Sequence, residues 1–120
     1  MIQKIDIAGV HMQVGDDLKK YVTKKIGNLD RYLPRVARES VHVEVKCKES
    51  NARGKNERTC EIVLHVPHET LTVKETTMNI YAAIDIAEEK LKTQLKKYKD
   101  RHGVKGFRRR ALARLKRRPA

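Results

Sequence analysis

The amino-acid sequence predicts an α+β domain with the element order βαβββα, in which a four-stranded mixed sheet carries two helices on one face. Three patterns support this prediction. Several segments alternate apolar and polar residues, which is typical of strands with one buried face. Two longer segments repeat apolar residues every three or four positions, as amphipathic helices do. Because each strand has a single apolar face, both helices are expected on the same side of the sheet.

The first half of the chain is predicted to form a strand followed by a helix. The strand is expected at residues 2–7, ended by Gly9. The helix is expected over residues 16–33, with Gly15 or Asp16 as its N-cap and a proline directly after it. A helix in this place would connect two parallel strands by a right-handed crossover.

The second half of the chain is predicted to form three strands and a second helix. The predicted strands cover residues 41–48, 59–66 and 71–73, the third being short. A polar, glycine-bearing loop separates the first two of them, which form a hairpin. The second helix has its apolar stripe over residues 80–98 and is capped by Thr77 or Asn79. Two helices over one sheet face give a double-stranded-RNA-binding-like architecture with an extra leading strand.

Charge divides the chain into two parts. The 28 Lys and Arg against 15 Asp and Glu give a formal net charge of +13. Residues 1–100 hold 19 basic and 15 acidic side chains, whereas residues 101–120 hold nine basic and none acidic. We therefore expect a domain at residues 1–101 and a basic tail at residues 102–120, disordered in the free protein because its charges repel one another. The expected partner is a polyanion.

Several function classes are excluded by what the sequence lacks. No apolar run is long enough for a transmembrane helix, and the first residues do not resemble a signal peptide, so a soluble, cytoplasmic protein without a membrane partner is expected. Ser-His-Asp, P-loop and glycine-rich dinucleotide motifs do not occur, so we expect neither an enzyme nor a cofactor or small-molecule substrate. With aromatic residues at 4%, recognition of single strands by base stacking is disfavoured.

Both helices carry a family resemblance. Residues 81–85 (YAAID) and 90–99 (KLKTQLKKYK) resemble the D-M-Y-A-A-I-D and K-L-x-x-Q-L-x-K-x-K segments of the ribosome hibernation promoting factors, which include the ribosome-associated inhibitor and the sigma-54 modulation proteins. Residues 5–7 (IDI), 11–14 (HMQV) and 17–22 (DLKKYV) agree as well. The resemblance covers residues 1–101. Residues 102–120 resemble neither the acidic tail nor the C-terminal dimerisation domain of family members, so pairing of two ribosomes is not implied for this chain.

The resemblance implies binding to the small ribosomal subunit and its rRNA, in the channel used by mRNA and tRNA. Such binding silences translation in stress or stationary phase. By family position, Lys25, Lys90 and Lys97 are the strongest candidates for rRNA contact, followed by Lys19 and Arg101. The protein is expected to be a monomer off the ribosome.

Helical spacing independently predicts rows of basic side chains on the two helices. RNA phosphates dominate affinity, so basic groups spaced on a rigid frame would suit an RNA helix. Lys90, Lys97 and Arg101 share one flank of the second helix, and Lys92, Lys96 and Lys99 share the other. The complete predicted rRNA-binding set is Lys19, Lys20, Lys24, Lys25, Arg31, Lys90, Lys92, Lys96, Lys97, Lys99, Arg101, Arg108, Arg109 and Arg110. The alternative is that these lysines only solvate exposed helix faces.

Cysteines and histidines are the remaining candidates for a functional site. Cys47 and Cys60 are expected opposite one another on the inward sheet face, as buried thiols rather than a disulfide. His65 and His68 are expected to be free surface histidines, so no metal site is predicted. The other sheet face is expected to present polar side chains to water.

Two further function classes stay open. A basic surface would bind any A-form duplex, which is the behaviour of a general RNA-binding or RNA-chaperone module. The sigma-54 label of the family raises a regulatory protein-interaction module as the other possibility.

Overall fold

The computed structural model describes residues 1–102 and confirms the predicted order βαβββα. The predicted tail, with Arg108, Arg109 and Arg110, falls outside these residues from position 103 onward. The elements are β1 (Ile5–Val10), α1 (Asp16–Gly27), β2 (His42–Ser50), β3 (Glu57–Val66), β4 (Glu69–Thr77) and α2 (Ile80–His102). Three short 3₁₀-helices join them, namely η1 (Asn28–Tyr32), η2 (Arg35–Ala37) and η3 (Ala52–Gly54).

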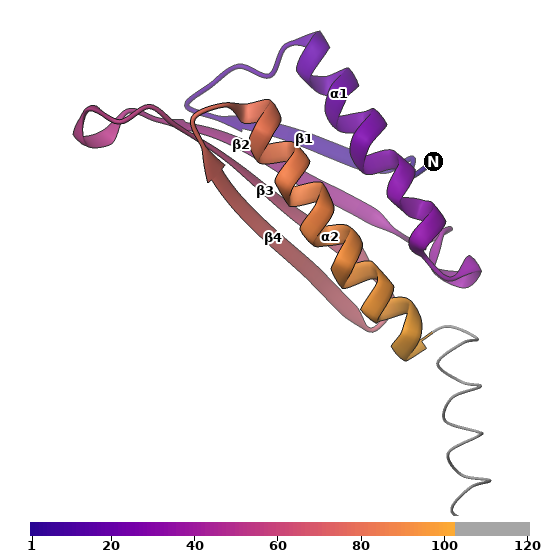
Figure 1. The fold of residues 1–120 in the computed structure, drawn as a ribbon. Helices are drawn as coiled ribbons and strands as arrows, with labels where there is room; N and C mark the ends of the chain where they lie inside the picture. Colours follow the sequence, from indigo (N-terminus) through magenta and orange to yellow (C-terminus); the bar gives the residue numbers. More distant parts are fainter. Residues whose placement is uncertain (103–120) are drawn as a thin grey trace, which may run out of the picture.

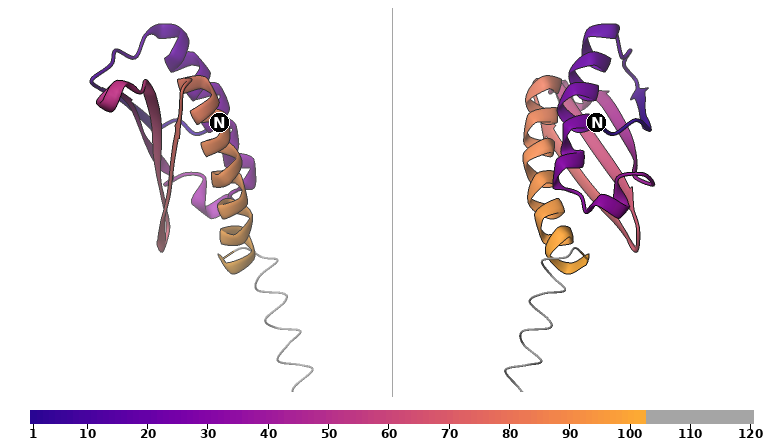
Figure 2. Two further views of the ribbon diagram at one scale, coloured as in Figure 1. Left: turned by 60° about the vertical axis from the view of Figure 1, so that its left-hand side comes forward. Right: turned by 90° about the vertical axis from the view of Figure 1, so that its right-hand side faces the viewer.

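The four strands form one mixed sheet in the order β1-β2-β3-β4. β1 runs parallel to β2, and the other two pairs are antiparallel. Helices α1 and α2 lie side by side across the sheet (Figure 1), and the two views of Figure 2 place both on the same face. The opposite face is left without a helix, as the alternation of the strands predicted.

The core lies between this sheet face and the two helices. The fully buried side chains come from every layer, and the largest are Tyr98, Ile26, Leu29, Leu33, Ile62, Leu64, Ile84, Leu91, Leu95, Val22, Val43 and Val45. Cys47 pairs with Cys60 in the β2–β3 register, and both thiols are buried and free, as predicted. The apolar stripes of both helices therefore face the inward residues of the strands.

The first strand differs from its prediction at both ends. It begins at Ile5, because the backbone N–H of Ile2 donates to the carbonyl of Gly27 at 2.9 Å instead of joining the sheet. Gly9 does not end the strand but pairs with Cys47 inside it. A Cβ at Gly9 would lie 2.2 Å from the Met12 carbonyl oxygen, so the glycine permits the following chain to fold back closely.

The first helix is shorter than predicted. α1 ends at Gly27, and the chain continues as the tighter helix η1, which keeps Leu29 buried. Leu33, which precedes Pro34, is extended with φ −93° and ψ 146°, as the residue before a proline prefers. A Cβ at Gly27 would lie 2.9 Å from Met1, so the N-terminal segment packs directly against the end of α1.

β4 is longer than predicted, with nine residues paired along β3.

None of the helices within residues 1–102 combines the length and the apolar character needed to cross a bilayer.

Candidate nucleic-acid interface

The helical face of the molecule is built from two helices with well-defined starts. Asn79 caps α2, because its side-chain oxygen accepts a hydrogen bond from the Tyr81 backbone N–H at 2.9 Å. α1 has Gly15 as its N-cap and two carboxylates, Asp16 and Asp17, in its first turn, where they oppose the positive end of the helix dipole. The basic side chains lie further along both helices.

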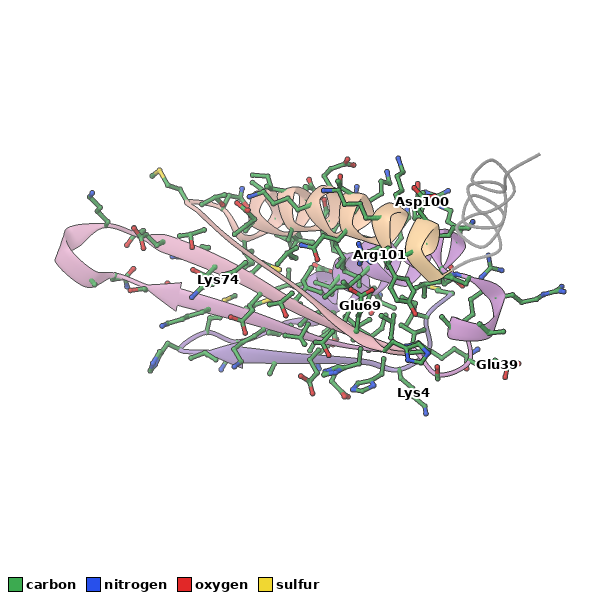
Figure 3. The ribbon with its side chains drawn as sticks, turned by 90° about the horizontal axis from the view of Figure 1, so that it is seen from below. Lys4, Glu39, Glu69, Lys74, Asp100 and Arg101 are labelled. Atoms are coloured by element: carbon green, nitrogen blue, oxygen red, sulfur yellow. The ribbon has the colours of Figure 1, made fainter. Side chains whose placement is uncertain are left out.

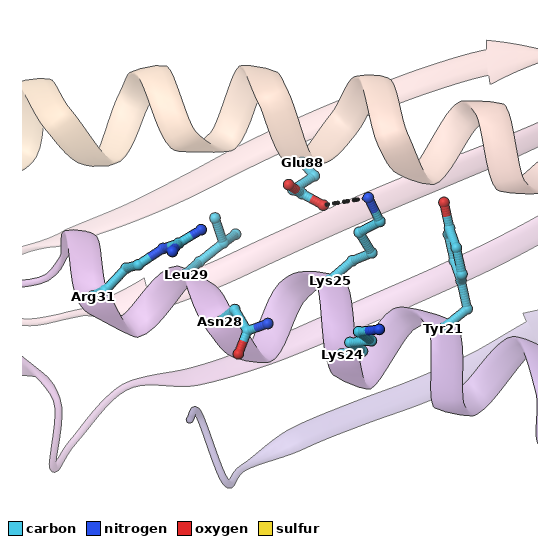
Figure 4. Close-up of a pocket in the computed structure, with 7 residues that line it drawn as sticks. All are labelled: Tyr21, Lys24, Lys25, Asn28, Leu29, Arg31 and Glu88. Carbon is cyan, nitrogen blue, oxygen red and sulfur yellow. Dashed lines mark ion pairs between the residues drawn. The ribbon is translucent and has the colours of Figure 1, made fainter.

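A groove of about 300 Å³ separates α1 and η1 from α2. We call it the inter-helix groove, and Figure 4 shows its lining residues Tyr21, Lys24, Lys25, Asn28, Leu29, Arg31 and Glu88. Lys25 reaches across it, with its Nζ 3.9 Å from Glu88 Oε2 and 3.7 Å from Asp85 Oδ1. The groove is therefore lined by cations from α1 and η1 and by one carboxylate, Glu88, from α2.

Hydrogen bonding and burial perturb two acidic groups in this groove. The hydroxyl of Tyr21 donates to Asp85, and this bond is the main reason that the pKa of Tyr21 rises to about 12. Burial raises the pKa of Glu88, and the nearby cations Lys25 and Lys92 oppose that rise. A carboxylate that is partly desolvated and held beside a lysine reduces the attraction of the groove for phosphate.

Three cations surround the ring of Tyr32, at the end of η1. The Arg31 guanidinium carbon lies 5.2 Å from the ring centroid, and the Nζ atoms of Lys92 and Lys96 lie at 5.4 and 5.8 Å. The pKa of Lys92 is raised, mainly by a side-chain hydrogen bond with Tyr32 and to a smaller extent by attraction to Glu89. We call these four residues, Arg31, Tyr32, Lys92 and Lys96, the Tyr32 cluster. It joins basic groups of η1 and α2 into one patch.

On the other flank of α2, two basic side chains pair with carboxylates of β4. Lys90 forms an ion pair with Glu75, and Arg101 contacts both carboxylate oxygens of Glu69 at 2.8 and 2.9 Å (Figure 3). These bonds fasten the helix to the sheet edge. Lys90 and Arg101 are thus paired with carboxylates of β4, whereas around Tyr32 the Nζ of Lys92 lies 3.6 Å from Glu89 of its own helix.

Comparison with known proteins decides the family. A model of the family described as sigma 54 modulation protein / S30EA ribosomal protein matches residues 5–103. The chain belongs to this family. Two relatives, each called ribosome hibernation promotion factor, are 35% identical over 98 residues in Lactococcus lactis subsp. cremoris (strain MG1363) and 32% identical over 98 residues in Staphylococcus aureus (strain COL). The alignments cover 82% of this chain but 50% and 49% of the relatives, so the chain spans about half the length of the curated relatives it matches.

Solved structures agree with this family membership. The N-terminal domain of Thermus thermophilus Protein Y has a TM-score of 0.66 and 30% identity, covering 80% of this chain and 99% of that domain. A ribosomal subunit interface protein from Coxiella burnetii has the same TM-score at 21% identity, covering 81% of this chain and 98% of that one, and it supports the fold. The predicted fold class and the predicted family are both confirmed.

Within this member of the S30EA family, the predicted basic residues separate into three groups. The groove and the Tyr32 cluster bring together Lys24, Lys25, Arg31, Lys92 and Lys96. Lys90 and Arg101 lie apart from them on the β4 flank. The remaining helix residues of the set are exposed to solvent, and they are Lys19, Lys20, Lys97 and Lys99.

Two features of the structure were not predicted from the sequence. Tyr32 is not among the candidate residues predicted from the sequence, although a tyrosine beside Arg31 and within reach of a second basic helix is a signal for ring–cation contact. His65 is not a free surface histidine, because its ring stacks on His42 with centroids 4.1 Å apart. The β2–β3 register that pairs Cys47 with Cys60 also pairs His42 with His65. The predicted pairing of the two cysteines therefore already implied that the histidines lie side by side.

Proposed function

We propose that this chain is a ribosome hibernation factor that binds the small ribosomal subunit through its helical face. It contacts rRNA in the channel used by mRNA and tRNA and silences translation in stress or stationary phase. The role is one of binding rather than of catalysis, which fits the names of the relatives. The chain acts through residues 1–102 together with its basic C-terminal residues.

The Tyr32 cluster is the observation that carries this proposal. Three cations converge on one ring from two helices, and lysines at positions 24 and 25 continue the basic surface along the groove. Because the sheet supports both helices, these charges keep a fixed spacing, which is what recognition of an A-form backbone by shape requires. The opposite sheet face carries the carboxylates Asp6, Glu44 and Glu61 beside Lys46, so its attraction for phosphate is weaker.

The experiment compares two double variants in sucrose gradients with purified ribosomal subunits. Lys92→Gln with Lys96→Gln removes two charges from the Tyr32 cluster, and Lys46→Gln with Lys74→Gln removes two from the exposed residues of the open sheet face. The first variant should move from the small-subunit fraction to the top of the gradient as salt rises, whereas the second should follow the wild type. Loss of two phosphate contacts should lower the log–log salt slope by roughly 1.4 to 1.8.

Specificity for the ribosome is tested by a parallel titration. Affinity for intact small subunits should exceed affinity for a generic RNA duplex of similar length at equal salt. Equal affinities would favour the general RNA-binding module instead. Binding that survives nuclease treatment of a pull-down would favour a regulatory protein interaction. A wild-type chain that stays at the top of the gradient at physiological salt would refute the hibernation role.

A further inference from the structure

The open sheet face holds a cluster of two histidines and one glutamate. His42 on β2 and His65 on β3 are direct partners in the antiparallel register, and Glu44 lies two residues along β2 on the same face. The His65 Nε2 atom is 3.5 Å from Glu44 Oε2. One ligand atom of each residue lies within 4.8 Å of the others. This arrangement is on the opposite side of the sheet from the helices.

We propose that His42, Glu44 and His65 form a binding site for a divalent transition-metal ion, with Zn²⁺ as its expected occupant. Two imidazoles and one carboxylate are a donor set that suits zinc, and three protein ligands leave a fourth position for water. Oxygen-only sites typical of Ca²⁺ and Mg²⁺ lack such nitrogens. The proposal is independent of the proposed ribosomal function, because it uses none of the residues of the helical face.

The geometry is close to what an ion would require. With metal–ligand bonds of about 2.1 Å, ligands around tetrahedral zinc lie about 3.4 Å apart. The His65–Glu44 separation of 3.5 Å already matches that spacing. The two rings are stacked with an angle of 11° between their planes, so one of them turns about its outer side-chain bond to aim a nitrogen at a shared ion. That torsion is broad for histidine, so the turn costs little.

The surroundings of the cluster favour a cation. The His65 Nε2 atom is buried and has no hydrogen-bond partner, which leaves its lone pair or proton unsatisfied. Asp6 on β1 pairs with Glu44 in the register and adds a second carboxylate beside it. Both carboxylates also line a hollow of about 260 Å³ beside the cluster. Cys47 and Cys60 are buried on the inward face and take no part.

Zinc titration of the metal-free full-length chain tests the site, with a chromophoric zinc chelator as competitor. We expect one ion bound per chain. Each of His42→Gln, Glu44→Gln and His65→Gln should weaken binding at least about tenfold. His11→Asn is the matched control, because it also removes one imidazole. The cluster lies beside the start of β1, where Asp6 pairs with Glu44, whereas His11 follows the last residue of this strand. Asparagine tolerates the φ of 58° at this position. This control should bind zinc like the wild type.

Two further measurements keep the result interpretable. Zinc should raise the Tm of the wild type and of His11→Asn, because an ion held between β2 and β3 binds only the folded chain, and it should leave the Tm of the three site variants unchanged. Circular dichroism of the variants without metal should match the wild type. Equal zinc affinity in the wild type and in His42→Gln or His65→Gln would overturn the proposal, leaving a ring stack with an ion pair. Weakened binding in His11→Asn would place the ion elsewhere and overturn it as well.

Discussion

Replacing Glu88 by glutamine should tighten RNA binding, because Glu88 is the carboxylate that opposes Lys25 in the inter-helix groove. The Glu88 side chain is 15% exposed, and its Oε2 atom lies 3.9 Å from the Lys25 Nζ. Glutamine keeps the shape of the side chain and removes its charge. Because burial already raises the pKa of Glu88, loss of the charge should change the free energy of unfolding little.

The size of the effect follows from Coulomb's law. A phosphate bound to Lys25 would lie about 7 Å from the Glu88 carboxylate, where repulsion amounts to about 0.6 kcal/mol in water and about 2.4 kcal/mol at an effective dielectric constant of 20. Screening at physiological salt, with a Debye length of about 8 Å, reduces these values. We expect a net gain of about 0.5–1 kcal/mol, which is a two- to fivefold decrease in Kd.

The assay is fluorescence anisotropy with a labelled small-subunit rRNA fragment, repeated at several salt concentrations. Glu61→Gln on the open sheet face is the matched control, since it makes the same change in net charge away from the groove. Its Kd should decrease less than that of Glu88→Gln, and the difference should shrink as salt increases. If the two variants bind equally, the groove does not contact RNA and the reasoning from its geometry fails.

Three other perturbations have defined outcomes. Tyr98→Phe removes the bond from a buried hydroxyl to the Pro67 carbonyl at 2.8 Å and should lower the free energy of unfolding in urea by about 1 kcal/mol; an unchanged urea midpoint would contradict this. Tyr21 should form phenolate only near its pKa of about 12, against an ordinary value of 10.0. Its hydrogen bond to Asp85 therefore stabilises the fold fully below pH 10, and this contribution is lost as the pH rises through 12. Absorbance titration of Tyr21→Phe should therefore lack the latest phenolate transition, and a missing transition near pH 10 would refute the assignment. Ending the chain after Arg101 removes eight basic residues. If four or five of them contact phosphate, the log–log salt slope of RNA binding should become shallower by about three or four. An unchanged slope would show that they make no such contacts.

Local patterning of the sequence was enough to predict the fold class. A period of two residues in the strands and of about 3.6 in the helices sets which side chains face inward, and these periods depend only on backbone geometry. The pairing of Cys47 with Cys60 followed from the same alternation, because one register buries both apolar faces of the hairpin. The family segments on both helices were likewise visible in the sequence.

The ends of elements and the state of each basic side chain were decided by tertiary structure. Helical spacing continues past Gly27, yet α1 ends there, where the Ile2 backbone N–H donates to the Gly27 carbonyl and Met1 packs against the glycine. Lys25 and Lys90 look alike in the sequence, but one reaches across the groove and the other is bonded to Glu75 on β4. Such contacts join residues far apart along the chain, and their distances depend on how the helices pack on the sheet. Residue order and periodicity therefore determined which surface is basic, whereas packing decided which of its charges remain available to a partner.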